Sequence, residues 1–174
     1  MSKINHDFSK ILVKLALICS FSPHLLFAEN KPCLGAKGHI HSNGGGFVAD
    51  SATVSPSAFV SKNSQVCGQA SVEGNSRILV SAIVDDKATV SGNAMISGLA
   101  HISGDARIDE NSIVDGHAKV FGNAIVSGSA KVRGNAKVGQ SAKVLDSAIV
   151  SGESNISGSS IVNGKMRIFS NKNK

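Results

Sequence analysis

The sequence of 174 residues has no tryptophan, no tyrosine and only three prolines, and only 17% of its residues are charged. So little charge excludes a long charged disordered tail, and 18 glycines are too few for a collagen-like chain. Without tryptophan and tyrosine, stacking on nucleic-acid bases would depend on phenylalanine alone. What remains is a chain of one-domain size in which 41% of the residues are hydrophobic.

The first 28 residues have the layout of a secretory signal peptide. Three lysines accompany an apolar run over residues 11–27, and the small Ala28 is followed by polar residues. Lys14 and Pro23 interrupt the run, which makes it too short and too polar for a membrane span. We therefore predict a Sec-type leader, residues 1–28, that is cleaved after Ala28, and a secreted or periplasmic mature protein. The alternative is an uncleaved leader that anchors the chain in a membrane.

Cleavage would leave 15 basic and 11 acidic residues, which is a modest excess of positive charge. A nucleic-acid-binding protein concentrates lysine and arginine in a stripe with aromatic side chains between them. An exported chain also rarely meets nucleic acid. We therefore expect no nucleic-acid partner.

The mature chain keeps two cysteines, Cys33 and Cys67. In an oxidising compartment two such cysteines are expected to form a disulfide. The bridge would attach the irregular segment that holds Cys33, residues 29–45, to the region that follows. The chain has no CxxC motif, and two isolated cysteines are weak support for a metal site.

A strict period of six residues runs through most of the chain. Every sixth residue from Val48 to Ile168 is Val or Ile, and a small residue stands two positions earlier in every hexad except the last, which has Met166. Glycine follows the aliphatic residue by two positions in most hexads. The 21 aliphatic positions are Val48, Val54, Val60, Val66, Val72, Ile78, Val84, Val90, Ile96, Ile102, Ile108, Val114, Val120, Val126, Val132, Val138, Val144, Val150, Ile156, Val162 and Ile168.

Each hexad is predicted to be one very short strand followed by a corner. Small and β-branched residues two positions apart point to the same side of a strand, and Gly followed by Asn or Asp tolerates the positive φ of a corner. Three strands and three corners make a triangular coil of 18 residues, so residues 46–171 predict about seven coils, spaced by about 4.8 Å. The predicted fold class is therefore all-β, a single-stranded parallel β-helix (solenoid).

This pattern resembles the hexapeptide-repeat superfamily, which includes sugar-nucleotide and antibiotic acyltransferases, serine acetyltransferases and gamma-class carbonic anhydrases. The resemblance covers residues 46–171 and implies a left-handed coil and a homotrimer, whereas general rules for parallel crossovers favour the right hand. The chain then divides into a leader (1–28), an N-terminal capping segment (29–45), the hexapeptide-repeat β-helix (46–171) and a tail (172–174).

The resemblance implies that enzymes of the superfamily work at clefts between subunits, which are built by loops or extra domains that interrupt the repeats. No hexad is interrupted here. The inward positions are small or aliphatic and would fill the narrow interior. We therefore expect no cofactor and no enzymatic activity, with a hexapeptide-repeat acyltransferase as the alternative.

Four histidines are candidate site residues. An acyltransferase would need a general base, for which His101 and His117 are weak catalytic candidates. A gamma-class carbonic anhydrase needs three imidazoles, two of them in a His-x4-His pair, and the chain has no such pair. His39 and His41 are weak metal candidates. We expect all four to be ordinary solvated side chains.

Two lines of outward residues suggest contacts with partners. The first mixes apolar and basic side chains, which is more typical of a subunit contact than of a catalytic surface. We call it the ridge, and it consists of Phe59, Arg77, Met95, Ile113, Lys131, Ile149 and Arg167. Within it Met95, Ile113, Lys131 and Ile149 are the predicted interface of a homo-oligomer. The second line stacks Lys119 over Lys137, while acidic residues cluster nearer the middle of the chain. This separation of charge suits an anionic glycan or contacts that order neighbouring molecules, and the alternative is a simple solvated face.

The solenoid must also protect its ends, because open sheet edges recruit other chains. We expect residues 29–45 to fold back over the N-terminal end, and Lys172 and Lys174 to block pairing at the other. The sequence therefore predicts an exported, non-enzymatic β-helical scaffold or binding protein, whose outer faces meet another copy or an envelope or extracellular glycan. An acyltransferase is the second hypothesis, and a metal protein related to gamma-class carbonic anhydrases is the third.

Overall fold

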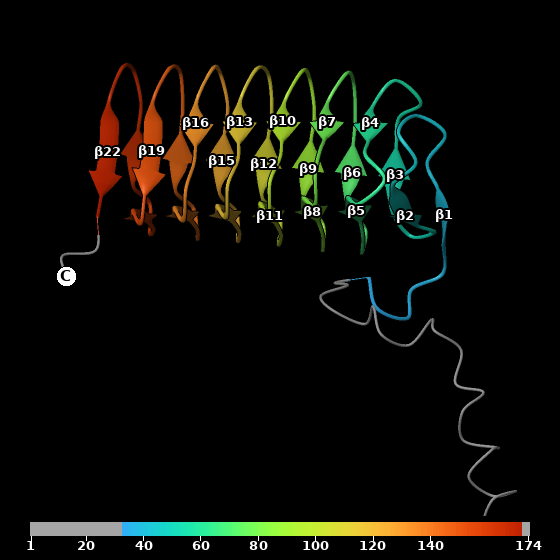
Figure 1. Cartoon of the computed structure of the whole chain (residues 1–174). Coiled ribbons are helices and arrows are strands. Elements are labelled where there is room, and N and C mark those ends of the chain that lie inside the picture. Colours follow the sequence, from blue (N-terminus) through green and yellow to red (C-terminus); the bar gives the residue numbers. More distant parts are fainter. Residues whose placement is uncertain (1–32, 172–174) are drawn as a thin grey trace, which may run out of the picture. The chain divides into compact units, whose positions relative to one another are not determined.

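The computed structural model describes residues 33–171. The predicted leader, residues 29–32 and the tail at 172–174 lie outside the described residues. The described part of the chain forms 22 strands and no helix, and most strands are only two residues long. The coils follow one another in chain order along one direction (Figure 1). The prediction of an all-β solenoid is confirmed.

The strands form three sheets, one for each side of the triangular coil, which we number 1 to 3. Sheet 1 contains β1 (Gly38–Ile40), β2 (Phe47–Ala49), β5 (Gln65–Val66), β8 (Ile83–Val84), β11 (His101–Ile102), β14 (Lys119–Val120), β17 (Lys137–Val138) and β20 (Asn155–Ile156). Sheet 2 contains β3 (Thr53–Val54), β6 (Ser71–Val72), β9 (Thr89–Val90), β12 (Arg107–Ile108), β15 (Ile125–Val126), β18 (Lys143–Val144) and β21 (Ile161–Val162). Sheet 3 contains β4 (Phe59–Val60), β7 (Arg77–Ile78), β10 (Met95–Ile96), β13 (Ile113–Val114), β16 (Lys131–Val132), β19 (Ile149–Gly152) and β22 (Arg167–Ser170).

Each repeat strand pairs in parallel with the strand one coil further along the chain. In sheet 3, Ile96 is opposite Val114, and Val114 is opposite Val132, so the offset is 18 residues at each step. Backbone hydrogen bonds join the coils, as where the Ile113 N–H donates to the Ala130 carbonyl at 2.9 Å. This register confirms the predicted coils of 18 residues, seven to each repeat ladder.

The core is the inner line of aliphatic and small side chains. The aliphatic residue of every hexad from Val60 to Val150 is fully buried, with 0% of its surface exposed. Burial weakens only at the ends, where Ile156 is 8% exposed and Ile168 is partly exposed. Where serine replaces alanine inside, its hydroxyl is hydrogen-bonded. Ser76 Oγ donates to the Glu73 carbonyl at 2.6 Å, whereas Ser64 Oγ is 2.7 Å from Ser61 Oγ.

Five corners of the described solenoid hold a residue other than glycine in the positive-φ region. In three of them the side chain accepts a hydrogen bond from a backbone N–H of the next coil. Asp86 and Asp146 each use Oδ2 to accept from the corner N–H one coil later, at 2.9 and 2.8 Å, and Gln140 Oε1 does so at 2.6 Å. Such polar side chains tolerate this backbone region and gain a bond there. Val80, at φ +66°, has no polar group to do the same.

The two ends of the solenoid differ. At the N-terminal end, the predicted disulfide joins Cys33 to Cys67, and β1 pairs antiparallel with β2. The Gly46 N–H also donates to the Val60 carbonyl at 2.9 Å. Residues 38–46 thus pair with the first strands of sheets 1 and 3. At the other end, β20, β21 and β22 are the last strands of their sheets.

Candidate functional site

The interior of the solenoid offers no room for chemistry, because its inner line is closely filled by aliphatic and small residues. Among residues 33–171, no group of three or more histidine, cysteine or acidic side chains could hold a metal ion. The same residues include no helix long and apolar enough to cross a membrane. Any site in the described chain therefore lies on the three outer faces, at the corners or at the ends.

His101 and His117 both lie at sheet 1. His101, on β11, is directly between Ile83 and Lys119 in the register, and its Nε2 atom is buried without a hydrogen-bond partner. His117 is exposed at the corner before β14. Within the described residues, neither imidazole forms an ion pair with a carboxylate. The structure thus places His101 beside Lys119 and pairs neither imidazole with a carboxylate.

The two metal candidates have different surroundings. His39, on β1, is exposed, and its Nδ1 atom is 3.7 Å from Asp50 Oδ1. His41 follows β1 and is only 6% exposed, so the expectation of a solvated side chain is wrong for this residue. Its Nδ1 atom is 3.1 Å from the Asn43 carbonyl oxygen. Each imidazole therefore has a separate partner. His41 also helps to shape the turn after β1, since its backbone N–H donates to the Gly46 backbone carbonyl at 2.8 Å.

The ridge lies along sheet 3 in unbroken register. Met95 is opposite Ile113, Ile113 is opposite Lys131, and Lys131 is opposite Ile149. All four predicted interface residues are half-buried by their neighbours in the same chain. The structure therefore gathers the predicted interface residues on one face.

The ridge borders an apolar corner that the sequence analysis missed. Val80 and Leu99 follow β7 and β10 of sheet 3 and are 59% and 53% exposed, with half-buried Leu79 beside Val80. A β-branched residue is unusual at positive φ, where the same corner of the next four coils has glycine. That substitution of valine for glycine was the available sequence signal.

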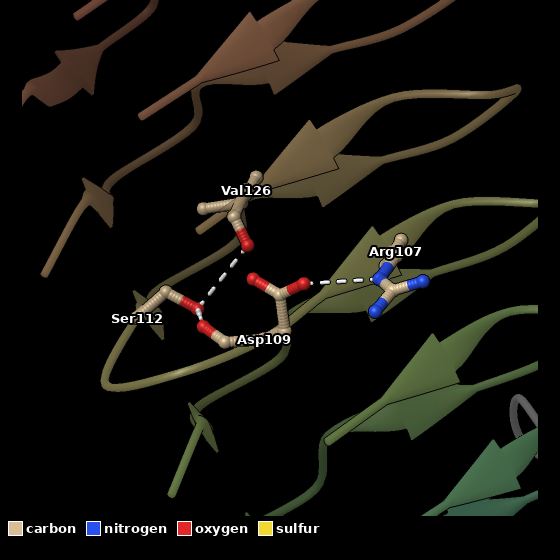
Figure 2. A network of polar contacts seen from close by, with 4 residues as sticks. All are labelled: Arg107, Asp109, Ser112 and Val126. Atoms are coloured by element: carbon tan, nitrogen blue, oxygen red, sulfur yellow. Dashed lines mark hydrogen bonds and ion pairs between the residues drawn. The ribbon is translucent and has the colours of Figure 1, made fainter. Parts of the chain in front are cut away.

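Sheet 2 carries a polar network that includes buried groups (Figure 2). Arg107 Nε donates to Asp109 Oδ2 at 2.9 Å, and the buried Ser112 Oγ donates to the Asp109 backbone carbonyl at 2.6 Å. Ser112 Oγ also lies 3.4 Å from the Val126 carbonyl oxygen, and Asp109 Oδ1 is buried without a partner. Since the serine hydroxyl is committed to backbone oxygens, the network fixes a corner and activates no nucleophile.

Charge is separated along the chain. Residues 73–115 hold seven acidic and three basic side chains, whereas residues 117–171 hold two acidic and seven basic ones. One ion pair joins the two regions, with Arg133 Nε 3.4 Å from Asp115 Oδ2. Sheet 1 shows the separation most simply, because Lys119 and Lys137 are direct partners on adjacent exposed positions. The second of the two predicted outward lines is therefore a compact basic surface.

Comparison with known proteins adds no further assignment, since no family model, no curated protein and no solved structure matches the chain.

Proposed function

We propose that this protein is an exported, non-enzymatic solenoid of the left-handed hexapeptide-repeat type that binds partners through its outer faces. The observation that carries the proposal is the uninterrupted repeat. Every coil uses its inner positions for packing, and the described chain has no inserted loop to enclose a substrate. The Cys33–Cys67 disulfide supports an oxidising compartment and therefore export.

The first partner is a second copy of the chain, held through the ridge on sheet 3 in a homotrimer. Met95, Ile113 and Ile149 supply apolar surface there, and the exposed Val80 and Leu99 extend it around the corner. An apolar surface with a rim of charged side chains is typical of subunit contacts. Arg77 and Arg167 flank the stretch from Met95 to Ile149 and provide that rim, whereas Lys131 lies within the stretch, between Ile113 and Ile149.

Sedimentation of the purified wild type and of Ile113→Lys/Ile149→Lys tests this assembly. We expect a trimeric wild type and a monomeric variant. The matched control is Ile125→Lys/Ile161→Lys, which places the same two changes, also two coils apart, on sheet 2. A wild type that sediments as a monomer contradicts the proposed trimer, and a control that dissociates like the ridge variant places the contact elsewhere.

Three further measurements test the rest of the proposal. The purified protein is expected to contain no stoichiometric metal and to show no affinity for acetyl-coenzyme A. Stoichiometric zinc would instead support the relative of gamma-class carbonic anhydrases, and acetyl-coenzyme A binding that is lost in His101→Ala would support the acyltransferase. Fractionated cells should hold a form that lacks residues 1–28, outside the cytoplasm.

A further inference from the structure

Two lysines on sheet 1 face each other without a counter-charge. Lys119 on β14 is the register partner of Lys137 on β17, and both side chains are exposed. Like charges directly opposite each other destabilise a sheet. Within the described residues, neither lysine takes part in an ion pair. An anionic group placed between the two ammonium groups would remove this repulsion and form charge-assisted hydrogen bonds.

An aromatic ring lies beside the two lysines. Phe121 follows Lys119 by two residues and is 38% exposed, while Gly139, one coil later, is buried. A Cβ atom on Gly139 would lie 2.9 Å from Cε1 of Phe121 and closer still to two other ring atoms. Gly139 is not among the glycines with positive φ, so its backbone does not require glycine. The absence of a side chain there is explained by the ring that lies against it.

These four residues, Lys119, Phe121, Lys137 and Gly139, form what we call the basic platform. It combines two cations on neighbouring strands with an apolar ring that directly follows one of those strands. A pyranose ring that carries an acidic group has the matching chemistry, because its C–H face can pack on the aromatic ring while the acid meets the lysines. Polar side chains occupy neighbouring sequence positions and suit the hydroxyl groups of a sugar: Ser103 is one coil before Phe121, and His117 and Asn135 precede the two lysines by two residues.

The small extent of the basic platform selects among polyanions. The lysine pair covers two coils, which is about 10 Å along the solenoid. Further toward the N-terminus, Asp85, Asp86 and Asp105 repel an anionic chain. Nucleic acids gain their affinity from many phosphate contacts along a basic stripe, which this surface is too short to provide. A glycan that carries one acidic group on each sugar ring needs only two or three ring-binding subsites, so a platform of this length is enough to bind it.

We propose that the basic platform binds an acidic polysaccharide, with one acidic sugar ring packed on Phe121 and its acid held by Lys119 and Lys137. This inference rests on the proposed function as a binding protein. It concerns sheet 1, whereas the proposed subunit contact concerns sheet 3, so each can fail without the other.

The test measures binding of the purified full chain to alginate, dextran sulfate, neutral dextran, single-stranded DNA and inorganic phosphate by calorimetry. We expect alginate or dextran sulfate to bind, with an affinity that falls as salt is added, and neutral dextran not to bind. If the protein binds neither alginate nor dextran sulfate, the proposal is overturned. Tighter binding of single-stranded DNA, or complete competition by millimolar phosphate, also overturns it in favour of a nucleic acid or a small free anion.

Matched variants separate the basic platform from the general positive charge. Lys119→Gln/Lys137→Gln is expected to lower the affinity by about tenfold or more, and Phe121→Ala by about fivefold. The control Lys143→Gln/Lys165→Gln removes the same charge from exposed positions away from sheet 1 and should change the affinity by less than about twofold. An equal loss in the control overturns the proposal.

Two readouts keep this inference distinct from the proposed self-association. Thermal unfolding should show that all three variants fold, and sedimentation should show that the two platform variants keep the oligomer of the wild type. A monomeric wild type that binds alginate would refute the subunit contact and leave the basic platform standing. A trimer that binds neither acidic polysaccharide would do the reverse.

Discussion

The inner and outer lines of the same coils follow opposite rules. Inside, the chain repeats Val or Ile with Ala or Ser at almost every level, and these side chains are buried. Outside, sheet 3 changes at each step, for example from Phe59 to Arg77 to Met95. Because parallel register stacks each residue on the one 18 positions later, only the inner line must repeat for the coils to pack. The outer line is free to carry the binding surfaces.

The largest loss of stability is expected when a charged side chain is placed on the inner line. Val126→Asp places an unpaired carboxylate at a position that is 0% exposed and should lower the free energy of unfolding by about 4 kcal/mol. The neighbouring Ser127→Asp, which points outward, should change it by less than about 0.5 kcal/mol. Urea unfolding at neutral pH measures both. Equal losses would show that the assigned inner and outer lines are wrong.

The disulfide attaches the N-terminal segment, which has no repeat, to the first coils. Its removal tests how much this attachment contributes to stability. Cys33 and Cys67 are 34 residues apart and buried, so replacing both with alanine should cost about 2–4 kcal/mol. Ser57→Ala/Ser81→Ala, two small changes at corners, serves as the control and should cost less than about 1 kcal/mol. Thiol titration of the unreduced mature protein should find no free thiol at either cysteine. Two reactive thiols under oxidising conditions would contradict the bridge.

The smallest effect is expected at the corners, where inner packing and outer surface meet. In the Ile113→Lys/Ile149→Lys background, where the proposed subunit contact is absent, Val80→Gly should stabilise the protein by about 1 kcal/mol, because glycine adopts φ +66° without strain. Asp86→Gly relieves a similar backbone conformation but loses the hydrogen bond to the Gly104 N–H, so it should gain less. Thermal unfolding compares them. If Val80→Gly lowers stability, the exposed valine contributes contacts that its exposure does not reveal.

Most of the fold could be predicted because the signal is periodic. The hexads located each strand between Val48 and Ile168 to within a residue or two, set the 18-residue register and identified the inner line. The disulfide was predicted from the two cysteines that remain once the predicted leader is removed. The antiparallel strand β1 carries no hexad, and the sequence indicated only a covering segment there.

The candidate sites were harder to predict, because they depend on contacts between residues one coil apart. The sequence placed the ridge and the stacked lysines in their lines, since a fixed offset is enough for that. It did not reveal the ring of Phe121 over Gly139, the positive φ of Val80 or the buried, unpartnered Nε2 of His101. Each of these depends on side-chain direction and local backbone, which the period does not encode.

By itself, the sequence determined that the chain coils, how many residues make one coil and which residues lie inside. These properties follow from a six-residue period with three sides to a coil, because each side then buries one aliphatic and one small residue. The tertiary structure alone decided which outer side chains meet. It stacks Lys119 on Lys137 and brings Asp86 to the Gly104 N–H, since only the folded register sets residues 18 positions apart side by side.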